Sequence, residues 1–270
     1  MTGVTGVTDM TKNAFGDVTV DVGEDYVAVA RIGRSPDNFF DAALIACLAD
    51  AYQWLDEVGA RAIVLCSEGK NFCAGADFTG RSGSGRIGAG GGAGELYREA
   101  LRLFEARLPV VAAVQGAAVG GGLGLACSAD FRVASTRARF SANFARLGLH
   151  QGFALSVTLP LIVGPQRAAG LLCTARRIGG DEALRIGLAD QLAEPDDLAG
   201  AARGLAAEIA ANGPLAVRAI RATLRGGLAE RARAAMEHEL AEQQALWQTA
   251  DFAEGIRASA ERRPPRFECR

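Results

Sequence analysis

Histidine is scarce in this chain, and its cysteines are not arranged in pairs. The 270 residues include two histidines and six cysteines, and no two cysteines form a C-x-x-C pair. Zinc sites and disulfide frameworks depend on closely spaced ligands or paired cysteines. We therefore expect no metal site and no disulfide framework, and we expect the chain to work in the reducing cytoplasm.

An excess of positive charge is also missing. Lys and Arg number 29 against 31 Asp and Glu, which gives a formal net charge of -2. A protein that attracts nucleic acid or an anionic membrane through its overall field carries a basic excess, so we expect no nucleic-acid partner. With 49% hydrophobic residues, the chain can instead bury one large core, or a core and a smaller helical lobe.

Several motifs that mark other protein classes are absent. Residues 1–14 are polar and show neither the apolar core of a secretory signal nor the Arg-rich pattern of a transit peptide, so we expect a disordered tail. The chain contains no G-x-S-x-G, Walker A or H-E-x-x-H motif, and its glycine triplet does not fit the dinucleotide fingerprint G-x-G-x-x-G. These absences argue against a Rossmann cofactor site, a serine hydrolase, a P-loop enzyme and a zinc protease.

One uncharged run, residues 108–129, is long enough to cross a bilayer. It contains five glycines, three of them in succession, and each glycine costs a helix roughly 1 kcal/mol. The letters VVAAV followed by QG are more typical of a buried strand and a turn. We therefore expect no membrane span in this run.

Hydrophobic periodicity predicts an α/β fold with its core over residues 15–195. Strands and helices alternate, which is typical of right-handed βαβ units. The expected strands are 18–21, 26–30, 62–66, 110–114, 130–134 and 139–140, and the expected helices are 39–58, 94–105 and a segment that begins at Gly121. Residues 196–270 show helical patterns only, at 198–211, 214–224, 228–247 and 251–262, and are expected to form a C-terminal helical lobe.

Two short stretches carry the chemistry: Phe72-Cys-Ala-Gly-Ala-Asp77 and the triplet Gly120–Gly122. Each follows a β-branched run and precedes a segment that can become helical, so each can aim a free backbone N–H into a cleft. In the first stretch this donor is the N–H of Ala76, and in the second it is the N–H of Gly121. Two such donors would form an oxyanion hole, which stabilises the negative charge that develops on a carbonyl oxygen.

Together these stretches resemble the paired signatures of the crotonase (enoyl-CoA hydratase/isomerase) superfamily, and the resemblance covers nearly the whole chain. It implies a spiral core of ββα units followed by a helical lobe. It also implies an acyl-CoA enzyme that stabilises a thioester enolate through the N–H groups of Ala76 and Gly121. The partners expected from it are an acyl-CoA thioester and further copies of the chain, in a trimer or a dimer of trimers.

The resemblance further implies a coenzyme A site, with coenzyme A bound as part of the substrate and with no tightly bound cofactor. The stretch that contains Ala74, Ala76 and Asp77 is similar to the CoA site of the family. An alternative role for Asp77 is to cap the segment that follows it. The glycine-rich segment 79–94 borders the acyl pocket in the family, and it is either a lid ordered by substrate or a linker without a role.

Basic residues at two distant points match positions that approach CoA in relatives. Arg34 lies in a loop that is near CoA in relatives, and Arg262 is the best match to the basic residues of the closing helix, with Arg263 next. Alternatively, Arg262 and Arg263 are a basic helix C-terminus that the helix dipole favours.

The chain departs from the family at the acid and base positions. Hydratases of the superfamily carry glutamates at the positions occupied here by Gly124 and Phe144, and other members place an aspartate in the loop 147–153, where this chain has Gln151 and Gly152. His150 lies in that loop and is the candidate acid/base, because imidazole titrates near neutral pH; the alternative is a structural histidine. We expect an isomerase, thioesterase or lyase, with hydration slow or absent. The alternative is a catalytically silent acyl-CoA-binding protein or assembly subunit.

Overall fold

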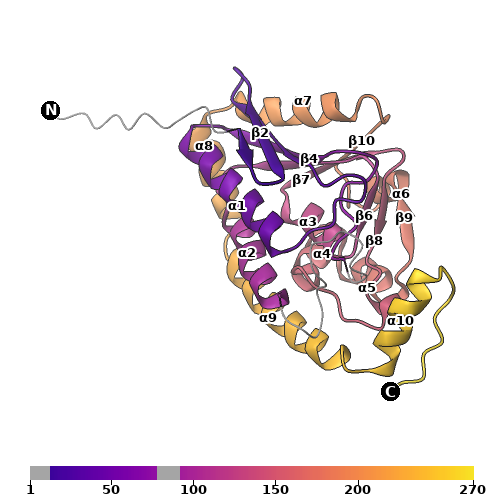
Figure 1. The fold of residues 1–270 in the computed structure, drawn as a ribbon. Coiled ribbons are helices and arrows are strands. Elements are labelled where there is room, and N and C mark those ends of the chain that lie inside the picture. Colours follow the sequence, from indigo (N-terminus) through magenta and orange to yellow (C-terminus); the bar gives the residue numbers. More distant parts are fainter. Residues whose placement is uncertain (1–12, 78–91) are drawn as a thin grey trace.

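The computed structural model describes residues 13–77 and 92–270 of the chain, and its elements alternate as the periodicity predicts (Figure 1). The strands are β1 (Ala14–Phe15), β2 (Val18–Val22), β3 (Val27–Ile32), β4 (Ala62–Ser67), β5 (Val110–Val114), β6 (Ala117–Val119), β7 (Phe131–Ser135), β8 (Arg139–Ser141), β9 (Arg177–Gly179) and β10 (Gln191–Ala193). The helices are α1 (Ala42–Glu57), α2 (Ala93–Glu105), α3 (Gly121–Ser128), α4 (Leu155–Val163), α5 (Pro165–Thr174), α6 (Gly180–Arg185), α7 (Leu198–Ala210), α8 (Pro214–Leu224), α9 (Leu228–Leu246) and α10 (Ala250–Ala260), with the 3-10 turn η1 (Ala145–Leu147).

The main sheet has seven strands in the order β1-β2-β3-β4-β5-β7-β10. The hairpin β2-β3 is antiparallel, as predicted, and β3, β4, β5, β7 and β10 are mutually parallel. A parallel sheet needs cover on both faces, because its crossover connections place helices there. This requirement explains why β4 and β5 read as nearly continuous apolar runs in the sequence.

The two faces of this sheet bury alternate residues of the same strands. In β4, Ile63 and Leu65 belong to the core that contains α1 and α2, whereas Ala62 and Val64 contact α7 on the opposite face. Helix α7 presents small and apolar residues at a spacing of four to that face, namely Leu198, Ala202, Ala206 and Ala210. Figure 1 shows α7 running across one side of the sheet, with α1 and α2 on the other. The first helix of the expected C-terminal lobe is therefore a layer of the sheet domain.

A second, three-stranded sheet, β6-β8-β9, ends beside the glycine triplet. The sequence predicted a turn at 115–116 and no element at β6, and none over 155–195, where α4, α5, β9, α6 and β10 occur. The uncharged run 108–129 is divided among β5, β6 and α3. Of the helices described here, none combines the length and the apolar character that crossing a bilayer requires.

The N-terminal tail expected over 1–14 lies mostly outside the described residues. Its last residue, Ala14, pairs with Thr19 in the strand ladder β1-β2, so the ordered fold begins slightly earlier than the sequence predicts. The segment 79–94 lies outside the described residues except for Gly92, which precedes α2, and Ala93 and Gly94, which begin it. Its role as lid or linker stays a prediction.

Candidate functional site

The first glycine turn is held between two neighbouring segments. The N–H of Cys73 donates to the carbonyl of Ala117 at 2.9 Å, and the N–H of Phe40 donates to the carbonyl of Gly75 at 3.0 Å. Gly75 has φ +86°, a left-handed conformation that glycine adopts without strain. After this turn, the N–H of Ala76 donates to no acceptor in the part of the chain that the structure describes.

The second turn brings the start of α3 against the first. Gly120 precedes α3 with φ +56°, and its N–H donates to the carbonyl of Ser141 at 2.8 Å. The N–H of Gly121 is one of the unpaired donors at the N-terminus of α3, and no acceptor for it occurs among residues 13–77 and 92–270. A side chain on Gly75 would place its Cβ 2.7 Å from the Val119 oxygen and 3.3 Å from the Gly121 nitrogen. The two turns therefore lie in direct contact.

The triplet is glycine because other chain atoms occupy the space of a side chain. A Cβ on Gly121 would overlap the ring of Phe40, and one on Gly122 would overlap the carbonyl group of Cys73. The thiol of Cys73 is buried, and burial raises its pKa to about 12. It therefore stays protonated at neutral pH and is not a thiolate nucleophile.

Both turns open onto one cavity, and it combines small residues with aromatic rings. No carboxylate, histidine or other charged side chain lines it within the described residues. The polar side chains that line it are Tyr97, Asn143, Gln243 and Trp247, and the other lining residues are Phe40, Ala74, Gly75, Ala76, Ala93, Leu96, Gly120, Gly121, Phe144, Leu147, Gly152 and Phe153. The segment 78–91 has no Asp, Glu or His in its sequence, so it cannot add a carboxylate or an imidazole.

Aromatic rings fill the space at positions 124 and 144, where the family resemblance implies glutamates. A Cβ on Gly124 would lie 2.6 Å from the Cβ of Phe153, so Phe153 fills the space that a side chain at 124 would need. The Phe153 ring lies 5.3 Å from the ring of Phe40, centroid to centroid. Phe144 is buried and lines the cavity at the second position. The sequence points to Gly124 and Phe144, but nothing in it points to Phe153.

His150, the candidate acid/base, is not among the residues that line the cavity. Its Nδ1 is 2.9 Å from the carbonyl oxygen of Gln151, and its ring lies edge to face with that of His238 on α9, 5.8 Å between centroids. His238 is exposed. The catalytic role of His150 stays a prediction.

Glu239 of α9 is close to other glutamates in the sequence, but it does not face solvent. Its side chain is fully buried and accepts hydrogen bonds from the N–H groups of Ala154 at 2.8 Å and Ser156 at 2.9 Å, at the N-terminus of α4. Burial raises the pKa of the Glu239 carboxyl, although hydrogen bonds from Ser156 and Ala154 and the nearby His150 oppose the shift. A carboxylate at this point caps unpaired N–H groups and interacts favourably with the helix dipole.

Gln243, one turn along α9, joins the same loop to α2. The Tyr97 hydroxyl of α2 donates to Oε1 of Gln243 at 3.1 Å, and Nε2 of Gln243 lies 3.1 Å from the carbonyl oxygen of His150 and 3.3 Å from that of Gln151. Tyr97 and Gln243 occupy the space beside Gly152 that a side chain there would need. These contacts fix the loop that carries Phe153 over the cavity.

The sequence alone did not reveal Tyr97, Glu239 and Gln243 of this network, or Trp247, which lines the cavity directly after α9. For Glu239 and Gln243 the sequence does contain a signal. They are the polar members of the buried stripe of α9, which also contains Ala232 and Met236. A polar residue within an apolar stripe indicates a buried hydrogen-bonding role. No local pattern marks Tyr97 or Trp247, because only the packing of α2 against α9 brings them to the cavity.

The predicted coenzyme A residues do not all line the cavity. Ala74 and Ala76 line the cavity, Asp77 is buried at 2% exposure, and what it would cap lies outside the described residues. Arg34 forms ion pairs with Asp17 at 2.6 Å and Asp41 at 3.0 Å. Burial alone would lower the pKa of Arg34, but these two carboxylates raise it overall.

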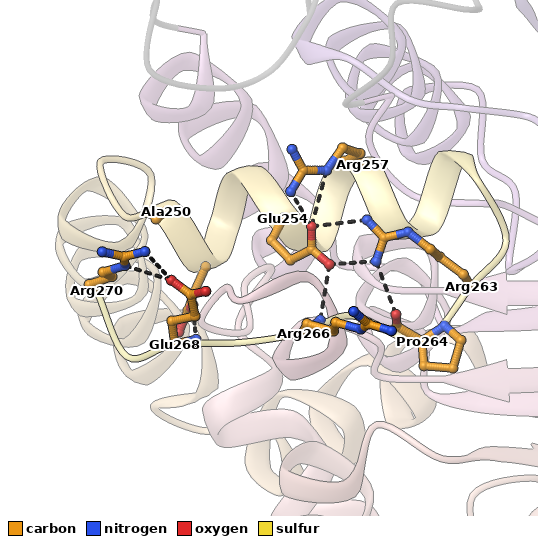
Figure 2. A pocket seen from close by; sticks show the side chains of 9 residues that line it. Ala250, Glu254, Arg257, Arg263, Pro264, Arg266, Glu268 and Arg270 are labelled. Carbon is orange, nitrogen blue, oxygen red and sulfur yellow. Dashed lines mark hydrogen bonds and ion pairs between the residues drawn. The ribbon is translucent and has the colours of Figure 1, made fainter.

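Arg257, Arg263 and Arg266 lie around Glu254 of α10 (Figure 2), and none of them is among the residues that line the cavity. Arg263 and Arg257 form ion pairs with Glu254, and the backbone N–H of Arg266 donates to its Oε1 at 3.0 Å. These hydrogen bonds, first those from Arg263, hold the pKa of the Glu254 carboxyl well below its usual range. Arg263 is therefore engaged in holding the C-terminal segment, whereas Arg262, with φ +56°, lies just beyond the helix end.

Comparisons with known proteins agree with this architecture. The family model described as enoyl-CoA hydratase/isomerase matches residues 23–270. The chain belongs to the enoyl-CoA hydratase/isomerase family. A probable enoyl-CoA hydratase of Rhodobacter capsulatus is 37% identical over 217 residues, covering 77% of this chain and 81% of the relative. A crotonyl-CoA hydratase of Syntrophomonas wolfei is 37% identical over 206 residues, covering 76% and 79%.

The fold is the crotonase fold of this family. A crystal structure of an enoyl-CoA hydratase/isomerase from Pseudoalteromonas atlantica superposes with a TM-score of 0.81 at 30% identity, and covers 93% of this chain and all of the other. The α/β core and the family that the two glycine turns indicated are thereby confirmed.

Proposed function

We propose that this family member binds acyl-CoA thioesters and stabilises their enolates through the N–H groups of Ala76 and Gly121. The observation that supports it most is that both donors lack an acceptor within the described chain and lie on two turns in direct contact at one cavity. The Gly121 donor also lies at the positive end of α3, where negative charge is favoured. Loss of one such donor in other enzymes costs about 2.7 to 4 kcal/mol of barrier, so this pair would be the largest catalytic contribution.

We further propose that the reaction is an isomerisation, a thioester hydrolysis or a lyase reaction, with hydration slow or absent. General acid and base groups each contribute about 10²–10⁴-fold, and the cavity has no carboxylate among the described residues to supply them. The same observation favours the second candidate, a silent acyl-CoA-binding protein or assembly subunit. His150 remains the proposed acid/base of the active enzyme.

The pantetheine of coenzyme A would enter past Ala74 and Ala76. Asp77, Arg34 and Arg262 are proposed as further contacts of coenzyme A, and Arg34 would have to share its guanidinium with Asp17 and Asp41. We propose no tightly bound cofactor, since the acyl-CoA is itself the substrate. A cytoplasmic location is proposed from the six free cysteines.

A turnover screen on acyl-CoA thioesters, combined with thioester binding by calorimetry, tests these proposals. If the protein is an active enzyme, it should turn over at least one thioester and hydrate crotonyl-CoA only slowly or not at all. If His150 is the acid/base, His150→Ala abolishes turnover and retains binding, whereas the exposed control His238→Ala retains both. Binding without any turnover would support the silent binder. Robust hydration of crotonyl-CoA would refute the argument from missing carboxylates, and an unaffected His150→Ala variant would remove His150 from the mechanism.

A further inference from the structure

The segment 37–40 is hydrogen-bonded to the first glycine turn. The carbonyl oxygen of Asp37 accepts from the N–H of Ala74 at 2.9 Å, and the N–H of Phe40 donates to the glycine carbonyl of the turn at 3.0 Å. Phe40 and Ala76 are also partners in an isolated parallel β-bridge. The turn that presents the N–H of Ala76 therefore takes its position from this segment.

The same segment packs against the second glycine turn. The ring of Phe40 fills the space that a side chain on Gly121 would need. Because the backbone of Phe40 is bonded to one turn and its ring contacts the other, a shift of the segment would move the N–H of Ala76 relative to that of Gly121. Two donors stabilise one oxygen only when both lie about 2.7–3.1 Å from it. The position of the segment is therefore a condition for the proposed function.

Asn38, in the middle of this segment, is fully buried and has φ +50°. Its Nδ2 donates to the carbonyl oxygens of Glu68 at 2.8 Å and Asn71 at 2.7 Å, and its Oδ1 accepts from the N–H of Arg34 at 3.1 Å. Asparagine is one of the few residues besides glycine that adopt a left-handed φ readily. The buried amide thus ties the segment to the loop between β4 and the first turn.

Asn71 provides a second tie to the same segment. Its Nδ2 donates to Oδ1 of Asp37 at 2.9 Å, and its Oδ1 accepts from the N–H of Ala117 in β6 at 3.3 Å. Unlike Asn38, the Asn71 side chain is only partly buried. Its loss should therefore loosen the segment less than the loss of the Asn38 amide.

We infer that Asn38 is a positioning residue whose buried amide fixes the segment 37–40 and thereby holds the N–H groups of Ala76 and Gly121 at the spacing that one thioester oxygen requires. The inference rests on the proposed oxyanion hole. Asn38 does not line the cavity, so it acts through Phe40 and touches no substrate atom. A displacement of about 1 Å that originates far from the chemistry can lower a rate about 10²-fold.

The test replaces the amide and follows the polarisation of a bound thioester. Asn38→Gly removes the side chain and keeps the left-handed backbone without strain. The readout is the infrared band of butyryl-CoA labelled with ¹³C at the thioester carbonyl, since hydrogen bonds to a carbonyl oxygen lower its stretching frequency. We expect the wild type to shift this band below that of free butyryl-CoA. Asn38→Gly should lose about half of the shift, and thioester turnover should fall about 10–100-fold.

Two controls separate positioning from other effects. Leu198→Ala removes a buried side chain on the opposite face of the main sheet, so it lowers stability and should keep the wild-type band. Affinity for free coenzyme A, measured by calorimetry, should be the same in Asn38→Gly and the wild type, because the Arg34 guanidinium is held by Asp17 and Asp41. An equal band change in Leu198→Ala, or lost affinity for free coenzyme A in Asn38→Gly, would overturn the inference.

The band also distinguishes failure of the inference from failure of the proposed function. A wild-type band in Asn38→Gly would refute the inference and leave the oxyanion hole standing. An unshifted band in the wild type would refute the oxyanion hole, and the inference with it. If Asn38→Gly does not fold, Asn71→Ala decides by the same measurement: a smaller loss of the shift supports the inference, and a wild-type band refutes it.

Discussion

Three glycine positions at this site have no room for a β-carbon. Gly75, Gly121 and Gly122 lie where a side chain would meet a carbonyl oxygen, an aromatic ring or a carbonyl group. Their role is thus steric as well as conformational, and only Gly75 also requires a left-handed φ. Residues with no functional groups therefore set the geometry of the two donors.

Gly121→Val tests the second turn. The added side chain would displace the Phe40 ring and fill the space in front of the N–H donor. We expect thioester turnover to fall about 10²–10³-fold, as on removal of an oxyanion donor. Gly204→Val on α7 is the matched control, since nothing lies within 4 Å of its Cβ position, and it should leave turnover unchanged. A Gly121→Val variant that binds and processes thioesters like the parent would show that the proposed donor is wrong.

Phe153 and Gly124 should be energetically coupled. Gly124→Glu alone should lower the free energy of unfolding by about 1–3 kcal/mol, because its Cβ would lie 2.6 Å from that of Phe153. Phe153 has φ +60°, so Phe153→Gly vacates the space without backbone strain. In urea unfolding, the double variant should be less destabilised than the sum of the single variants by about 0.5–3 kcal/mol. Simple additivity would mean that Phe153 does not exclude a side chain at 124.

At the scale of elements, α9 organises one side of the site. Its buried stripe carries Glu239 against the N-terminus of α4, then Gln243 against the loop and Tyr97 of α2, and Trp247 follows at its end. The loop between η1 and α4 is held at both ends by this helix. A change in α9 should therefore alter the cavity without touching either glycine turn.

The buried Glu239 carboxyl predicts a dependence of stability on pH. Its pKa is raised above 4.5 in the folded state, so the folded protein binds this proton more readily than the unfolded chain. The stability that this group contributes is fully present below about pH 4.5 and is lost as the pH rises through its folded pKa. Urea unfolding should show that the wild type loses stability relative to Glu239→Gln as the pH rises toward neutral.

The exposed neighbour Glu237→Gln serves as the control for this comparison and should show no such trend. Glu239→Ala should destabilise the protein by about 2–4 kcal/mol at neutral pH, because it leaves two helix N–H groups without an acceptor. A difference between wild type and Glu239→Gln that does not vary with pH would contradict the assignment of a raised pKa.

For the whole molecule, α8 presents an apolar surface that one chain leaves uncovered. The helix has no buried residue, and Leu215, Ile220 and Leu224 are 80%, 59% and 81% exposed. The exposed Leu161 of α4 lines the adjoining groove. Exposed apolar patches of this kind mark association surfaces, and the family resemblance supplies the expected trimer or dimer of trimers.

Light scattering at micromolar concentration checks this prediction. The wild type should have the mass of a trimer or hexamer, and Leu215→Lys combined with Leu224→Lys should shift it toward the monomer. Gln53→Lys, an exposed polar position on α1, should leave the mass unchanged. A monomeric wild-type protein would contradict the prediction.

The sequence by itself determined the family, the order of the main elements and the two glycine turns. Both bounds of the strand 110–114 and of the helix 214–224 were predicted correctly, because apolar periodicity, Pro214 and flanking glycines are local signals. The same locality made the free N–H groups of Ala76 and Gly121 predictable, since an N–H at a turn or helix start has no acceptor within its own element.

Only the tertiary structure decided what surrounds these donors. Tyr97, Phe153 and Glu239 come from three segments far apart in the chain. Packing alone places Phe153 in the space beside Gly124, places Glu239 at the N-terminus of α4, and leaves Nε1 of Trp247 without a partner among the described residues. His150, chosen for its chemistry, lies against His238 and does not line the cavity. Side-chain surroundings depend on contacts between distant segments, which no local pattern encodes, whereas backbone turns are set by neighbouring residues.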